Sequence, residues 1–197
     1  MSYPATALHR SNLLTYGSVA CGVGTIAAAL QSSAAGAGAL LALAALLDTF
    51  DGRFARQFTR SPEQQAVGGE LDSLVDAVVF GIAPVAAVGI LLSSGGGVPS
   101  WWWSAAIVYV ICALTRLAHF NVAHDEQRFV GIPTPVAALV WSTMLLWGPD
   151  ASRSFVAAIA LGTAMVSPLP IGRPGAGGLS VFASWPIVLV IAHVARL

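Results

Sequence analysis

The chain has 197 residues, of which 56% are hydrophobic and only 9% are charged, and its net charge is zero. Its mean hydropathy of +0.77 is typical of a protein whose helices cross a membrane several times. The balanced charge gives no reason to expect nucleic-acid binding. The two cysteines, Cys21 and Cys112, lack the spacing of a metal-binding motif. We therefore expect an all-α, polytopic membrane helix bundle.

The first half of the chain predicts three spans, which follow an interfacial segment at residues 1–11. They are expected at Leu13–Leu30, from Ala34 to about Phe50, and from about Leu71 to Leu92. Ser11 or Asn12 would cap the first helix, the second would continue as a helix to Arg56, and Pro84 would kink the third. The polar residues 58–65 are predicted to form a loop, although Pro62 could also begin a helix.

The second half predicts four further spans, so that residues 1–197 form one domain with a six-helix core and an additional C-terminal span. These spans run from Trp101 to about Val122, then over Ile132–Trp147, Ser154–Leu169 and Leu179–Val194. Residues 101–103 are three consecutive tryptophans, which are expected at a membrane interface. If the last run lay at the interface instead, the number of spans would be six.

All nine basic residues are arginine, and their distribution predicts an orientation. Alternate loops place seven of them on one side of the membrane: Arg10, Arg53, Arg56, Arg60, Arg116, Arg128 and Arg173. Only Arg153 and Arg196 fall on the other side. Cytoplasmic loops carry the excess of basic residues, so the first side is expected to face the cytoplasm. The protein is expected to lie in the inner membrane of the cell.

Four aspartates lie on that same side. Asp48 and Asp51 are three residues apart at the end of one apolar run, and Asp72 and Asp76 are four apart at the start of the next. Either spacing places both carboxylates on one face of a helix. Four such charges in a small volume repel one another unless a cation neutralises them, and oxygen ligands suit Mg²⁺ or Mn²⁺. The alternative is that these are solvated charges at helix ends, but acidic residues beside apolar spans tend to be functional.

The aspartates belong to a longer motif. Asp-x-x-Asp-Gly-x-x-Ala-Arg is followed by Gly-x-x-x-Asp-x-x-x-Asp, a pattern that resembles the signature of the CDP-alcohol phosphatidyltransferase family. The matching positions are Asp48, Asp51, Gly52, Ala55, Arg56, Gly68, Asp72 and Asp76. The connector of residues 57–67 is longer than the family's usual one. Small residues at Gly52 and Ala55 leave room for a nucleotide beside the helix backbone, and the planar guanidinium of Arg56 can pair with a phosphate.

The resemblance implies an enzyme that uses Mg²⁺ or Mn²⁺, with two ions held by Asp48, Asp51, Asp72 and Asp76. It implies that CDP-diacylglycerol is bound by residues of the signature, namely Asp48, Asp51, Gly52, Ala55, Arg56, Gly68 and Asp72. It also implies that Asp76 deprotonates the acceptor alcohol and that the protein is a homodimer. The spacing alone does not distinguish ligand from base among the four aspartates.

Four other segments resemble the CDP-diacylglycerol–serine O-phosphatidyltransferase branch of the family. They are residues 69–84, 115–122, 129–135 and 164–167. This resemblance implies transfer of the phosphatidyl group to L-serine, with Arg116, His119 and Asn121 in the acceptor site. His119 stands where that branch usually has a second arginine. A different acceptor, such as glycerol 3-phosphate, inositol phosphate or another amino alcohol, therefore stays open.

A second class of function also accounts for acidic residues in membrane helices. A divalent-cation or proton-coupled transporter would place them near the middle of the bilayer, within paired and broken helices. Here the acids lie at one edge of the predicted bundle, and no inverted repeat is evident in the sequence. The enzyme is the favoured hypothesis.

Overall fold

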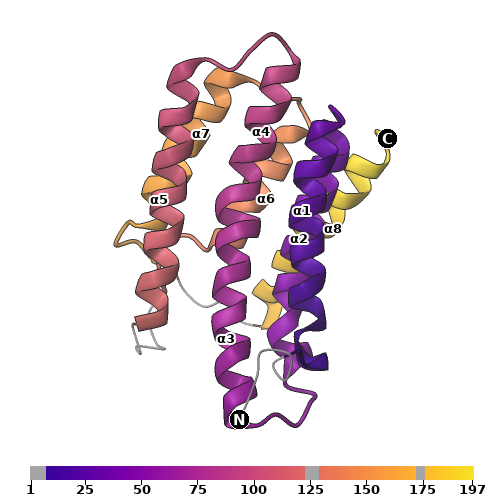
Figure 1. The fold of residues 1–197 in the computed structure, drawn as a ribbon, viewed down its shortest axis with the longest axis vertical. Helices are drawn as coiled ribbons and strands as arrows, with labels where there is room; N and C mark the ends of the chain where they lie inside the picture. The colour runs from indigo at the N-terminus through magenta and orange to yellow at the C-terminus, as the bar shows by residue number, and fades with distance from the viewer. Residues whose placement is uncertain (1–7, 123–128, 172–175) are drawn as a thin grey trace.

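The protein is a long bundle of helices, most of which run along its long axis (Figure 1). The computed structural model describes residues 8–122, 129–171 and 176–197. In chain order the helices are η2 Arg10–Asn12, α1 Leu13–Leu30, α2 Ala34–Ala55, α3 Pro62–Asp76, η3 Ala77–Ile82, α4 Ala83–Ser94, α5 Ser100–Val122, α6 Thr134–Leu145, α7 Ala151–Met165 and α8 Ala176–Val194. A two-residue strand β1, Phe129–Val130, pairs antiparallel with β2, Pro170–Ile171.

The prediction of a polytopic membrane bundle is confirmed. Within the described residues, four helical stretches are long and apolar enough to cross a membrane: Arg10–Leu30, Ala34–Ala55, Pro62–Ser94 and Ser100–Val122. Three shorter apolar helices accompany them, at Thr134–Leu145, Ala151–Met165 and Ala183–Val194. The predicted polar loop at residues 124–128, with Arg128, and the predicted position of Arg173 lie outside the described residues.

Several predicted boundaries were wrong, each for a local reason. Residues 62–65 are helical and not part of the loop. The alternative start at Pro62 is confirmed, because Ser61 and Gln64 form a reciprocal capping box that begins α3 there. Neither Ser11 nor Asn12 caps α1 with its side chain; a short 3₁₀ turn, capped by the ring of His9, leads into that helix.

The two short helices also differ from their predicted spans. α6 begins only at Thr134, with Pro133 before its first residue. α7 begins at Ala151, where the Asp150 side chain accepts a hydrogen bond from the backbone nitrogen of Arg153 at 2.8 Å. It ends at Met165, and β2, which follows it in the chain, pairs with β1.

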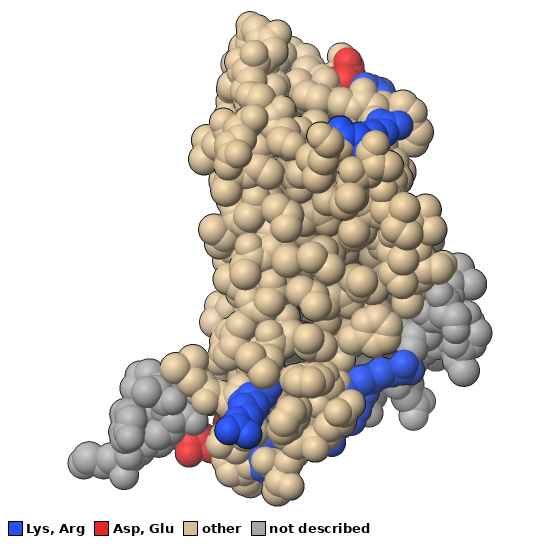
Figure 2. Space-filling model, turned by 90° about the vertical axis from the view of Figure 1, so that its right-hand side faces the viewer, with Lys and Arg blue, Asp and Glu red and all other residues tan. Residues whose placement is uncertain are grey.

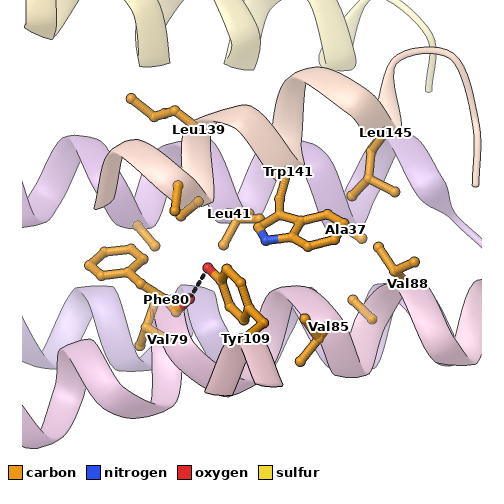
Figure 3. Close-up of a cluster of buried hydrophobic side chains, with 14 of the residues drawn as sticks. Ala37, Leu41, Val79, Phe80, Val85, Val88, Tyr109, Leu139, Trp141 and Leu145 are labelled. Carbon is orange, nitrogen blue, oxygen red and sulfur yellow. Dashed lines mark hydrogen bonds between the residues drawn. The ribbon is translucent and has the colours of Figure 1, made fainter. Parts of the chain in front are cut away.

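The kink predicted at Pro84 takes the form of a π-helical turn, η3, between α3 and α4. Proline has no N–H, so it cannot bond the carbonyl four residues earlier, which is that of Phe80. The hydroxyl of Tyr109, on α5, donates to that carbonyl at 2.8 Å, as Figure 3 shows. The turn that follows Asp76 is therefore held to α5 by a buried hydrogen bond.

The core lies between α2, η3–α4, α5 and α6 (Figure 3). Trp141 packs edge to face against both Tyr109 and Trp102, with ring centroids 5.7 and 6.2 Å apart. Trp102 is fully buried, so only its neighbours Trp101 and Trp103 are exposed as expected for a membrane interface. The helical period directs the middle tryptophan of the three inwards.

Charged side chains gather near the two ends of the bundle. Figure 2 shows one face, on which arginines lie near both ends and the broad band between them carries none. An uncharged band flanked by polar ends is what a bilayer requires. Arg10 precedes α1, and Arg53 and Arg56 lie at the end of α2. Because α1 and α2 form an antiparallel hairpin, these three belong to one end of the bundle.

Candidate metal centre and adjoining hollows

Asp48, Asp72 and Asp76 converge between α2 and α3. Each offers a carboxylate oxygen, and the three oxygens lie within 4.8 Å of one another. Asp72 and Asp76 are one turn apart on α3, and Asp48 reaches them from α2. Asp51, one turn beyond Asp48, has its carboxyl in contact with that of Asp72. The structure thus brings together all four aspartates of the motif, three of them in the tight group.

Among the described residues, no basic side chain lies within ion-pair distance of these three carboxylates. Within the described part of the chain, the ion pair found is that of Arg153 with Asp150, on α7. The Oδ1 atom of Asp76 is buried and has no hydrogen-bond partner. An all-oxygen donor set with an unpartnered buried carboxylate oxygen fits a hard divalent cation.

Two threonines hold the carboxylates from neighbouring helices. Thr15, on α1, donates its hydroxyl to Oδ2 of Asp51 at 3.2 Å. Thr134, the first residue of α6, donates to Oδ2 of Asp76, also at 3.2 Å. Both threonines are buried. Neither threonine was predicted from the sequence, where the one available signal was a hydroxyl residue within an apolar run.

A first hollow of about 320 Å³ opens beside the carboxylates. It is lined by Ser11, Asn12, Thr15, Asp51, Gly52, Ala55, Arg56, Arg60, Gln65, Gly68, Gly69 and Asp72. Six of the eight signature positions therefore face it. At Gly52 no atom lies within 4 Å of the place that a Cβ would occupy, so this turn of α2 presents bare backbone to the hollow. Arg60, from the long connector, and Gln65, from the start of α3, also line this hollow, and neither was predicted as a binding residue.

A second hollow, of about 330 Å³, lies at the end of α5. It is lined by Thr115, Arg116, His119, Phe120, Val130, Met165, Val166, Ser167 and Pro168. Arg116 is only 8% exposed, its Nε has no hydrogen-bond partner, and its Cζ lies 4.4 Å from the centre of the Phe120 ring. It is also close enough to Asp76 for electrostatic attraction. The arrangement offers a buried cation to an anionic ligand.

Asn121 lies elsewhere. It is exposed and outside the residues that line either hollow, and its Oδ1 accepts a hydrogen bond from the hydroxyl of Ser73 at 2.8 Å. This contact ties the end of α5 to α3, one residue after Asp72. Of the three residues predicted for an acceptor site, the structure brings together only Arg116 and His119.

Comparisons with known proteins show which family the sequence resembles. A CDP-alcohol phosphatidyltransferase family model matches residues 8–168. A CDP-diacylglycerol–serine O-phosphatidyltransferase of Mycobacterium leprae is 37% identical over 134 residues, covering 64% of this chain and 43% of the relative. One of Bacillus subtilis is 32% identical over 129 residues, covering 64% of this chain and 70% of the relative.

A third relative, an archaetidylserine synthase of Methanothermobacter thermautotrophicus, is 30% identical over 172 residues, which cover 86% of this chain and 72% of that protein. The matched region spans less than half the length of the mycobacterial relatives. The family match nevertheless includes both pairs of aspartates, α6 and every residue that lines the two hollows. The chain belongs to the CDP-alcohol phosphatidyltransferase family.

Proposed function

We propose that this protein transfers the phosphatidyl group of CDP-diacylglycerol to L-serine, giving phosphatidylserine and CMP. The observation that carries the proposal is the cluster of Asp48, Asp72 and Asp76, set between a hollow with two arginines and a second hollow with one. The relatives supply the reaction class: two that are described above bear the name CDP-diacylglycerol–serine O-phosphatidyltransferase.

The first hollow is proposed to take the CDP part of the donor. Arg56 and Arg60 provide positive charge for a diphosphate, and the bare backbone at Gly52 allows close approach. Asp48, Asp51, Ala55, Gly68 and Asp72 complete the proposed binding residues. The acyl chains would remain in the membrane, since many large apolar side chains are exposed on the outside of the helices.

Asp48, Asp51, Asp72 and Asp76 are proposed to hold Mg²⁺ or Mn²⁺, as two ions. When bound, such ions neutralise charge on the diphosphate and on the departing CMP. The protein's own part is to position the carboxylates: Thr15 holds Asp51 and Thr134 holds Asp76, each through a hydrogen bond of 3.2 Å.

Asp76 is proposed to be the general base. Its Oδ1 is buried and unpartnered, so it is available to accept the proton of the acceptor hydroxyl. The hydroxyl oxygen then forms a bond to the phosphorus that carries diacylglycerol. The bond from that phosphorus to the bridging oxygen breaks, and CMP departs with the electron pair.

The second hollow is proposed to take the acceptor. A buried arginine suits a carboxylate-bearing molecule, and Arg116 lies near both this hollow and Asp76. The names of the bacterial and archaeal relatives both contain serine, although they refer to different lipids. This agreement favours serine as the acceptor. Asn121 is proposed to act indirectly, through the hydrogen bond with Ser73 that ties the end of α5 to α3.

The proposed setting is the inner membrane, with the active site facing the cytoplasm. Arg56 and Arg60 line the hollow beside the aspartates, whereas Arg153 lies in the first turn of α7 and Arg196 follows α8. The excess of arginine at the aspartate end supports this orientation. Residues 1–197 are proposed to act as one domain and as a homodimer, since small residues on the helices allow close packing between subunits.

The test is CMP release by the purified protein from CDP-diacylglycerol, Mn²⁺ and L-serine in mixed micelles. The proposal predicts release that depends on both serine and metal. Glycerol 3-phosphate, inositol phosphate and ethanolamine form the comparison panel. CMP release with one of these and not with serine would keep the family chemistry and reject the acceptor; no release with any of them would reject the enzyme.

A further inference from the structure

The contact between Thr134 and Asp76 links residues 58 positions apart. The hydroxyl of Thr134 donates to Oδ2 of Asp76 at 3.2 Å, and Oδ1 of the same carboxyl is left buried without a partner. Thr134 is fully buried and is the first residue of α6. A carboxyl with one oxygen tied and the other free has its plane fixed, because rotation about its terminal bond would break the hydrogen bond.

Thr134 is itself held firmly by the segment before α6. Gly131 has φ of +69°, and a Cβ there would overlap the carbonyl oxygen of Met165. The backbone nitrogens of Gly131 and Ile132 donate to the carbonyls of Leu169 and Ala164, at 3.0 and 3.1 Å. The residues that lead into α6 are therefore fastened to the end of α7, which also lines the second hollow.

The start of α6 adds an electrostatic contribution. Pro133 and Pro135 flank Thr134, so the first turn of the helix has a fixed backbone and few free N–H groups. The positive end of the helix dipole lies at this turn, and the hydrogen bond from Thr134 places Asp76 beside it. The dipole favours the charged carboxylate, and the Thr134 hydroxyl fixes its orientation.

We propose that Thr134 is a positioning residue for Asp76: its hydroxyl holds Oδ2 so that Oδ1 faces the metal and the acceptor. The expected effect on kcat rests on the proposed function. Thr134 touches neither substrate in this scheme and acts only through Asp76.

The experiment compares Thr134→Val, which keeps the shape and removes the hydroxyl, with Thr134→Ser, which keeps the hydroxyl. Thr143→Val is the matched control, because Thr143 is on the same helix and donates to the carbonyl of Leu139 within it. For each variant we would measure kcat and KM from CMP release, and the affinity for Mn²⁺ by electron paramagnetic resonance without substrates. A hydrogen bond to a carboxylate predicts a fall in kcat of about tenfold or more for Thr134→Val.

The expected pattern is a lower kcat and weaker Mn²⁺ binding for Thr134→Val, with KM for CDP-diacylglycerol little changed. Thr134→Ser should recover most of both, and Thr143→Val should match the unmodified protein. Equal losses in the Val and Ser variants would show a packing role and overturn the inference, as would unchanged kcat and Mn²⁺ affinity in Thr134→Val. If the unmodified protein released no CMP, the proposed function would fail, while Mn²⁺ binding would still decide the role of Thr134.

Discussion

The hydroxyl of Tyr109 donates a hydrogen bond to the carbonyl of Phe80 at 2.8 Å, in the interior of the bundle. That carbonyl has no intrahelical α-type partner because Pro84 stands four residues later. The contact therefore satisfies a buried acceptor and fixes the π-helical turn directly after Asp76. It connects the helix that carries Arg116 to the helix that carries the second pair of aspartates.

Tyr109→Phe should lower the stability of the protein without altering its hydrophobic packing. A buried carbonyl left unpaired costs about 1–3 kcal/mol, so the midpoint of thermal unfolding in detergent should fall. Tyr16→Phe, on α1, is the control for removing a tyrosine hydroxyl elsewhere. An unchanged midpoint for Tyr109→Phe would mean that the Phe80 carbonyl finds another donor.

Asp76→Asn should abolish turnover while the protein stays folded. An amide cannot accept the proton of the acceptor alcohol, and loss of a general base lowers rates by about 10²–10⁴-fold. CMP release and thermal unfolding would both be measured. Asp150→Asn is the matched control, since an asparagine can still cap α7, far from the site. Substantial turnover by Asp76→Asn would move the base to another residue.

Arg116→Ala should raise KM for serine more than KM for CDP-diacylglycerol. The buried guanidinium is the cation of the second hollow, and loss of a charged hydrogen bond corresponds to about a tenfold effect or more. Arg153→Ala, at the other end of the bundle, is the control. An equal effect on both substrates would remove Arg116 from the acceptor site. A separate variant, His119→Arg, tests whether a second guanidinium lowers KM for serine.

Arg60→Ala should raise KM for CDP-diacylglycerol and leave KM for serine unchanged. Arg60 belongs to the long connector, lines the first hollow beside Arg56, and would contact a diphosphate there. The expected rise is about tenfold for one charged hydrogen bond. Arg53→Ala tests the loss of an exposed arginine near the same end of the bundle. If both variants behaved alike, the effect would be one of general surface charge.

Gly38→Ala should destabilise the packing of α8 on α2. A Cβ on Gly38 would overlap the ring of His193, which is fully buried and contacts Ser142. Forcing atoms into a packed interface costs about 1–3 kcal/mol, whereas alanine normally favours a helix over glycine. Gly52→Ala, where a Cβ meets no atom within 4 Å, is the stability control. A higher unfolding midpoint for Gly38→Ala would contradict the packing argument.

The sequence by itself determined the parts of this protein that depend on local pattern. The first apolar run and the turn after it coincide with α1 and residues 31–33, because hydropathy and helix stops are properties of neighbouring residues. The convergence of the aspartate pairs was predicted for the same reason: spacings of three and four place carboxylates one turn apart on a helix face, and the structure brings all four together.

Only the tertiary structure decided which distant side chains complete the site. The partners of Asp51 and Asp76 are Thr15 and Thr134, 36 and 58 residues away, and Asn121 turned out to bond Ser73 and not to line the second hollow. Trp102 likewise faces the core although its two neighbours are exposed. Such contacts depend on how helices pack and rotate against one another, and that rotation is set by the whole bundle, so no short stretch of sequence specifies it.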